Sequence, residues 1–174
     1  MESPLSLDFD RLELGADFRS QGRTITETDL VSFAALTGDR HPLHTDTVWA
    51  GESEFGERIA HGSMVLSYCV GLVPFDPRWV LALRGFERVA FKRPVRIGDT
   101  IRVEGSLESL REIDATTGLV VFAWRVVNQR DEAVVLAKAL VVWRRQAEAE
   151  LTAAAVGERA DPDRRDSARR EVFL

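Results

Sequence analysis

The stretch "SMVLSYCVGLV", Ser63 to Val73, decides the fold because it is apolar on every face of a helix. A helix of that kind is normally enclosed by other structure rather than laid on a surface. Prolines at positions 74 and 77 end it, since proline cannot continue a helix. We therefore expect a buried central helix that makes its contacts through Met64, Val65, Tyr68 and Leu72.

The residues after this helix have the composition of long strands. "WVLALRGFERVAF" (79–91) is apolar-rich and "DTIRVEGSL" (99–107) alternates, while "GLVVFAWRVVN" (118–128) and "AVVLAKALVVW" (133–143) are β-branched. "QRDE" (129–132) separates the last two runs as a hairpin turn would. We predict a meander of antiparallel strands curled around the helix, which is a single α+β domain.

Two helices are expected before the central one, and the second of them is short. In "ITETDLVSFAALTG" (25–38), Thr26 is a candidate N-cap with Asp29 three residues later, and Gly38 is a natural stop. A second helix could start at Asp46 or Thr47 and run to Ala50. The predicted order is thus helices first and strands afterwards.

Composition limits the classes of function. A chain of 174 residues suits one domain, and a net charge of −5 gives no field that would attract nucleic acid. The single cysteine, Cys69, excludes an intrachain disulfide and fits a reducing compartment. The acidic N-terminus lacks the pattern of a secretory signal, and the longest apolar run (64–75) is too short to span a bilayer. We expect a cytoplasmic protein without a membrane partner.

The β pattern stops after Arg144. We expect an N-terminal lead-in over residues 1–14 and the folded domain over 15–144. Residues 145–174 form a charged, Ala/Arg-rich tail that is expected to be partly helical or disordered.

"TGDRHPLHTD" (37–46) carries the first chemical signal. Asp39 and His44 lie five residues apart across Pro42, and a loop around the proline can bring both side chains to one water. A polar surface turn explains the same residues without chemistry. A metal site of Asp39, His41, His44 and Asp46 is a weaker alternative, because this spacing matches no usual zinc site.

"IAHG" (59–62) carries the second signal. Gly62 lies where the central helix begins, so its N–H is expected to be free of an intrahelical acceptor and open to a ligand oxygen. The alternative is a glycine that only eases chain entry, with His61 as a polar cap. Lys92, Arg93 and Arg96 could meet phosphates, although basic residues at a strand edge also serve solubility.

Three segments in this order and spacing resemble the MaoC-like, R-specific enoyl-CoA hydratase family. They are "FAALTGDRHPLHTDTVWA", "FGERIAHGSMVLSYCVGL" and "VAFKRPVRIGDTIRVEGSL". The resemblance covers roughly residues 15–144 and implies the hotdog fold, a long helix wrapped by an antiparallel sheet. It places the family's catalytic aspartate and histidine on Asp39 and His44, and its carbonyl-polarising glycine on Gly62. The chain departs from the family at His41, which replaces an asparagine, and at Val70, which stands near the place of a serine in some members.

The resemblance also implies an activity, a lyase reaction that adds water reversibly to a 2-enoyl thioester of coenzyme A or a carrier protein. It implies catalytic Asp39, His44 and Gly62, with His61, Ser63, Lys92 and Arg93 as substrate-binding residues. No metal or redox cofactor is expected. The chain is expected to form a homodimer or a higher homo-oligomer. The rivals are a hotdog thioesterase, disfavoured because residues 63–73 hold no Asp or Glu, and a non-catalytic acyl-binding subunit.

Overall fold

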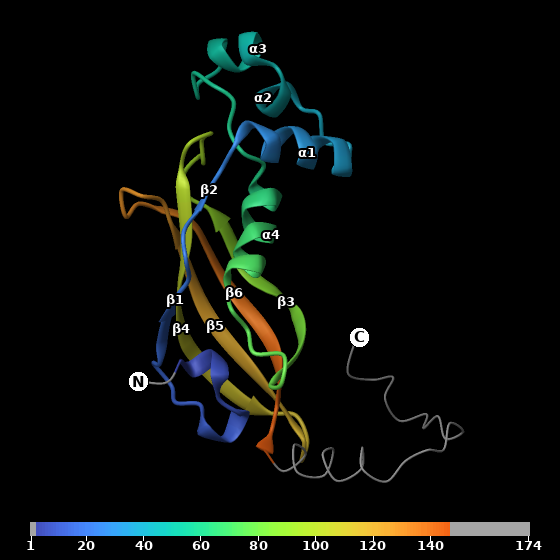
Figure 1. The fold of residues 1–174 in the computed structure, drawn as a ribbon, viewed down its shortest axis with the longest axis vertical. Coiled ribbons are helices and arrows are strands. Elements are labelled where there is room, and N and C mark those ends of the chain that lie inside the picture. Colours follow the sequence, from blue (N-terminus) through green and yellow to red (C-terminus); the bar gives the residue numbers. More distant parts are fainter. Residues whose placement is uncertain (1–2, 147–174) are drawn as a thin grey trace, which may run out of the picture.

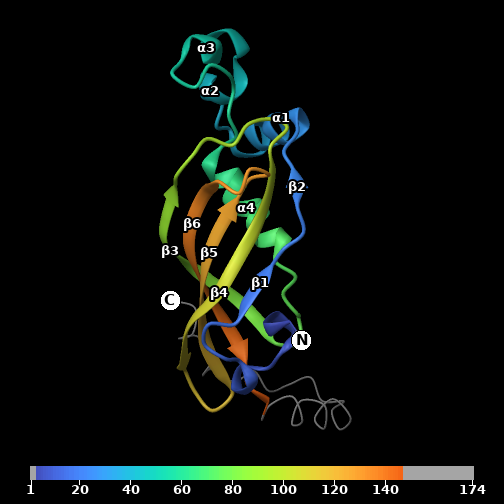
Figure 2. The ribbon, with the colours of Figure 1, turned by 90° about the vertical axis from the view of Figure 1, so that its left-hand side faces the viewer.

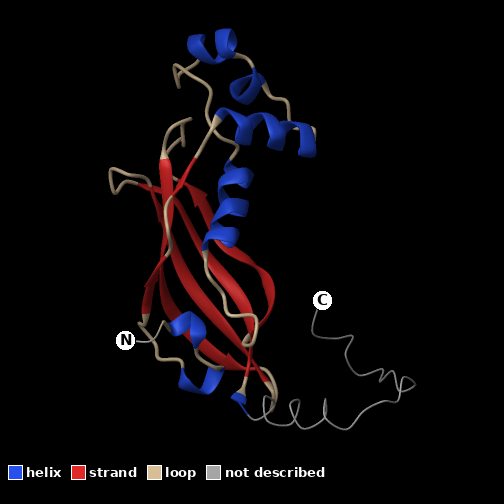
Figure 3. Cartoon of the chain, in the orientation of Figure 1, coloured by secondary structure: helices blue, strands red, loops and turns tan. Residues whose placement is uncertain are grey.

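The computed structural model of the protein describes residues 3–146. Its elements, coloured by type in Figure 3, are η1 (Pro4–Ser6), η2 (Phe9–Arg11), β1 (Asp17–Arg19), β2 (Arg23–Thr24), α1 (Glu27–Thr37), α2 (Pro42–Thr45), α3 (Thr47–Glu52), α4 (Gly62–Leu72), β3 (Val80–Phe91), β4 (Thr100–Glu112), β5 (Thr117–Val127) and β6 (Ala133–Arg144). The expectation for the C-terminal tail falls almost wholly on residues 147–174, which lie outside the described residues.

The central helix is α4, which lies along one face of the curled sheet (Figures 1 and 2). Met64, Val65 and Cys69 are buried, and Tyr68 and Leu72 pack against the core as partly buried side chains. The expectation of complete enclosure is wrong for this single chain, because Ser63, Ser67 and Gly71 are exposed. These three positions recur every four residues, so they share the helix face that the sheet does not reach.

None of the helices within residues 3–146 combines the length and the apolar run that crossing a bilayer requires. The central helix α4 contains 11 residues.

The strand order differs from a simple meander. β4, β5 and β6 are consecutive neighbours as expected, but β3 pairs with β6 and forms the far edge in the order β1-β4-β5-β6-β3. Residues 92–99 join β3 to β4, and they include Pro94 and are too many for a tight hairpin. This connection therefore crosses the end of the sheet instead of folding β4 back onto β3.

The N-terminal residues also contribute to the sheet and the core. β1 and β2 pair with β4, so strands precede the first long helix and the predicted helices-first order is wrong there. Leu5, Phe9 and Leu12 are buried, and the Phe9 ring lies over Gly118, where any Cβ would collide with it. The described part of the lead-in is thus packed against the domain.

α1, α2 and α3 stand beyond one end of the sheet, above the start of α4 (Figure 1). Thr26 and Asp29 form the capping box that the sequence predicts, and Gly38 ends α1 with a φ of 77°. Asp29 also accepts hydrogen bonds from Tyr68 of α4 and from Arg23, each at 2.8 Å. Burial alone would raise the pKa of Asp29, but hydrogen bonds from Thr26, Tyr68 and Arg23 outweigh it and lower the pKa to about 2. This carboxylate fixes α1 to α4.

Candidate active site

Asp39 follows directly from the end of α1. Because Gly38 adopts the left-handed conformation, the chain leaves the helix axis at once, and Asp39 lies in an exposed turn. Its main-chain N–H donates to the Thr37 hydroxyl at 3.2 Å, and its carboxylate accepts the His41 N–H at 3.3 Å. These local hydrogen bonds hold the turn. They use only Oδ1 of the Asp39 carboxylate and leave Oδ2 out.

His44 is carried by α2, which begins at Pro42 with His41 as its N-cap. The Nδ1 atom of His44 lies 2.7 Å from the Ile59 carbonyl oxygen. Since a carbonyl only accepts, Nδ1 must carry the proton, and the neutral ring keeps its lone pair on Nε2. The pKa of His44 is lowered, first by burial and then by the neighbouring imidazoles, against the opposing effects of Ile59 and Asp39. The ring is therefore held as a neutral base.

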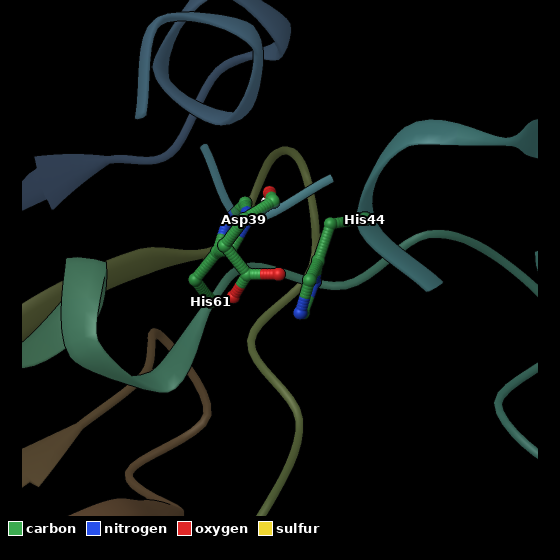
Figure 4. Close-up of side chains that lie close together, drawn as sticks. All are labelled: Asp39, His44 and His61. Atoms are coloured by element: carbon green, nitrogen blue, oxygen red, sulfur yellow. Dashed lines mark hydrogen bonds between the residues drawn. The ribbon is translucent and has the colours of Figure 1, made fainter. Parts of the chain in front are cut away.

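Asp39, His44 and His61 meet at one point (Figure 4). One carboxylate oxygen and one nitrogen from each ring all lie within 4.8 Å of one another. Figure 4 shows the Asp39 carboxylate turned toward the His44 ring. No direct hydrogen bond joins the three side chains to one another within residues 3–146, and groups this close can share a single bridging water.

His61 has a place that the sequence did not indicate. It is 1% exposed, and its ring stacks on that of His44 with centroids 3.8 Å apart and an interplanar angle of 26°. Its Nε2 lies 3.0 Å from the main-chain oxygen of Asp39. His61 therefore contacts both the His44 ring and the main chain of Asp39. Its expected role as a substrate-binding residue stays a prediction.

The geometry opposes the metal set considered from the sequence. His41 and Asp46 are occupied in capping α2 and α3, accepting main-chain N–H groups at 3.2 Å and 2.9–3.0 Å. His61 takes their place beside Asp39 and His44, and its ring is tilted by 26° from that of His44. The expectation that no metal takes part stays a prediction.

Gly62 begins α4 and lines a cavity of about 570 Å³ together with His44. No side chain caps this helix end, because the His61 ring makes no capping hydrogen bond, so the first N–H groups remain available. The cavity walls are largely apolar and include Val65, Val95, Val134 and Val135. A carbonyl beside the Gly62 N–H would thus have an apolar chain buried behind it.

The other predicted substrate-binding residues lie on the same cavity. Ser63, Lys92 and Arg93 all line it, and Lys92 and Arg93 are exposed. Arg93 also donates to the Ala133 carbonyl at 3.2 Å and lies 3.8 Å from Glu132. The fold therefore brings two cations to the rim of the cavity that holds Gly62 and His44.

A wider groove of about 860 Å³ crosses the outer face of the sheet over β4, β5 and β6. Glu104, Arg125 and Lys138 line it, whereas neither member of the Asp39/His44 pair does. Size alone would favour this groove, but His44 and Gly62 line the smaller cavity, and Asp39 lines neither of the two.

Comparisons with known proteins show the family of the chain. Residues 11–126 match the family described as MaoC like domain. Protein MaoC of Klebsiella aerogenes is 42% identical over 101 residues, which are 58% of this chain and 30% of that protein. The (R)-specific enoyl-CoA hydratase of Aeromonas caviae is 32% identical over 101 residues, covering 58% of this chain and 75% of that protein.

Solved structures confirm the hotdog fold that the resemblance implies. The monoamine oxidase regulatory protein from "Archaeoglobus fulgius" superimposes with a TM-score of 0.76 at 37% identity, over 80% of this chain and 95% of that one. The chain spans less than two thirds of the length of the first curated relatives that it matches.

Proposed function

The chain belongs to the MaoC-like domain family, and from that membership we propose that it adds water reversibly across the α,β double bond of a 2-enoyl thioester. The relatives named as (R)-specific enoyl-CoA hydratase and 3-hydroxybutyryl-CoA dehydratase support a lyase of this type. The proposal rests on one observation. Side-chain atoms of Asp39 and His44 lie within 4.8 Å of each other, and His44 lines the same cavity as Gly62.

The tautomer of His44 supports a role for this ring as the base, which the sequence leaves open. Because Nδ1–H is bound to the Ile59 carbonyl, the lone pair on Nε2 is the proton acceptor for a water held between His44 and Asp39. The water oxygen bonds to Cβ as the π pair moves toward Cα and the thioester carbonyl. Asp39 and His44 together then return a proton to Cα, so the reaction takes up one water and no net proton.

Gly62 stabilises the charge that develops during this step. The thioester oxygen becomes enolate-like, and an N–H at a helix N-terminus is a preorganised donor for it. We assign the rim cations Lys92 and Arg93 to the phosphates of coenzyme A or of a carrier-protein arm. In this proposal no metal or redox cofactor takes part.

We also propose that the chain acts as a homodimer joined at β3. β3 is an edge strand, and Leu81, Leu83 and Val89 are 40%, 40% and 38% exposed on it. An unpaired edge with exposed apolar side chains is a favourable site for pairing with a second copy. Light scattering after size-exclusion chromatography measures the mass directly, and a monomer at micromolar concentration would contradict this assignment.

Hydration of crotonyl-CoA tests the proposed reaction. Loss of enoyl-thioester absorbance without release of free thiol is the expected result. Thiol release would show a thioesterase, and tight binding without turnover would show an acyl-binding subunit. Either outcome replaces the proposal.

A further inference from the structure

His61 contacts both members of the proposed catalytic pair and lies next to the proposed oxyanion donor. Its Nε2 is 3.0 Å from the Asp39 carbonyl, its ring covers one face of His44, and the following residue is Gly62. The other ring face lies against Phe33 of α1, with centroids 5.0 Å apart. One buried side chain thus joins α1, α2 and α4.

The partners of His61 define its protonation. A carbonyl oxygen only accepts, so the Nε2–H group of His61 donates to the Asp39 carbonyl. Nδ1 is buried without a hydrogen-bond partner among residues 3–146. His61 therefore makes its hydrogen bond through Nε2 alone, to the main chain of Asp39.

His44 is held from two directions by one short segment. The Ile59 carbonyl binds its Nδ1 edge at 2.7 Å, and the His61 ring, two residues later, supports its face. The Ala60 N–H between them donates to the Val95 carbonyl at 2.7 Å, which fastens this segment to the connection between β3 and β4. The orientation of the His44 ring is therefore set by residues 59–61.

We propose that His61, in place of the substrate-binding role expected from the resemblance, is a positioning residue that fixes Asp39 and His44 relative to the Gly62 N–H without touching the substrate. This inference rests on the proposed hydration, because it concerns the geometry of that same site. A displacement of about 1 Å in a catalytic group can cost 10²-fold in rate. Loss of either His61 contact is therefore expected to lower kcat, with KM nearly unchanged.

Two substitutions separate the two contacts. His61→Phe keeps a ring against His44 and removes the donor to Asp39, whereas His61→Gln keeps an amide donor near the Nε2 position and removes the ring. Each is expected to lower kcat about 10- to 100-fold with KM within threefold. Phe33→Leu is the matched control, because it loosens the packing behind His61 and leaves both contacts in place.

The readout that a merely structural role would not move is the His44 tautomer, followed by long-range ¹H–¹⁵N NMR. The wild type and His61→Phe should show a single Nδ1–H form, and His61→Gln a mixture of tautomers. The proposal is overturned by a kcat within threefold of wild type in either variant. It is equally overturned if Phe33→Leu, at the same loss of melting temperature, loses as much kcat. If the wild type hydrates no enoyl thioester, the proposed function fails, and the tautomers of the two variants still decide the role of His61.

Discussion

Gly62→Ala tests whether the first N–H of α4 binds the thioester oxygen. A Cβ built on Gly62 would lie 2.9–3.0 Å from the Phe91 ring, which lines the same cavity, so the added methyl enters the space that the substrate needs. Phe91 is 54% exposed, and its ring can turn away at little cost to the fold. The oxygen cannot avoid the methyl while it keeps a hydrogen bond of about 2.9 Å to the N–H. We expect kcat to fall by about 10²–10³, the usual effect of losing one oxyanion donor.

Steady-state hydration of crotonyl-CoA, with thermal melts of the same preparations, measures this effect. Gly71→Ala is the matched control, because Gly71 lies in the same helix and its Cβ would meet nothing within 4 Å. Alanine is favoured over glycine inside a helix by about 0.5–1 kcal/mol, so Gly71→Ala should gain stability and keep its turnover. The double variant Gly62→Ala/Phe91→Leu removes the ring that the new methyl displaces.

The loss in Gly62→Ala should appear in kcat more than in KM, because the oxygen gains charge only on the way to product. Recovery of turnover in the double variant would show that the displaced Phe91 ring, and not the crowded oxygen, caused the loss. A large fall in melting temperature with turnover retained would mean that Gly62 is only a structural glycine at a helix start. Either result refutes the assignment of an oxyanion donor.

The remaining predictions concern the pair, the core and the contact between α1 and α4. Asp39→Asn and His44→Ala should each lower kcat by about 10²–10⁴ at a nearly unchanged melting temperature, and near-wild-type turnover in either would reject the pair. The acidic limb of kcat/KM should lie below pH 6.5, because burial lowers the pKa of His44 and only its neutral form accepts a proton; a limb above 6.5 would contradict this. Met64→Asp places an unpaired charge at a fully buried position and should cost about 3–5 kcal/mol in chemical unfolding, whereas Ser67→Asp, exposed on the same helix, should fold. The pKa of Asp29 is lowered from 3.8 to about 2, so its ionised carboxylate stabilises the folded state. In chemical unfolding, the wild type should be more stable than Asp29→Asn by about 2 kcal/mol above pH 4, and this difference should be lost as the pH falls through 2.

Local features of the sequence determined the elements themselves. The all-round apolar run at 63–73 predicts α4, and the pairing of Thr26 with Asp29 predicts the start of α1, because helix caps and apolar runs act within a few residues. The turn around Pro42 also places Asp39 near His44 by short-range geometry, since Gly38 ends one helix and Pro42 starts the next.

Only the tertiary structure decided how distant elements meet. The pairing of β3 with β6 depends on which edge of the sheet receives a strand after the chain has crossed it, and no local pattern specifies that edge. The stacking of His61 on His44 depends in the same way on the end of α1 packing against the start of α4, which the contact of Asp29 with Tyr68 secures. Residues that lie far apart along the chain come together through the summed burial of the whole core, and a single sequence does not display that sum as a local pattern.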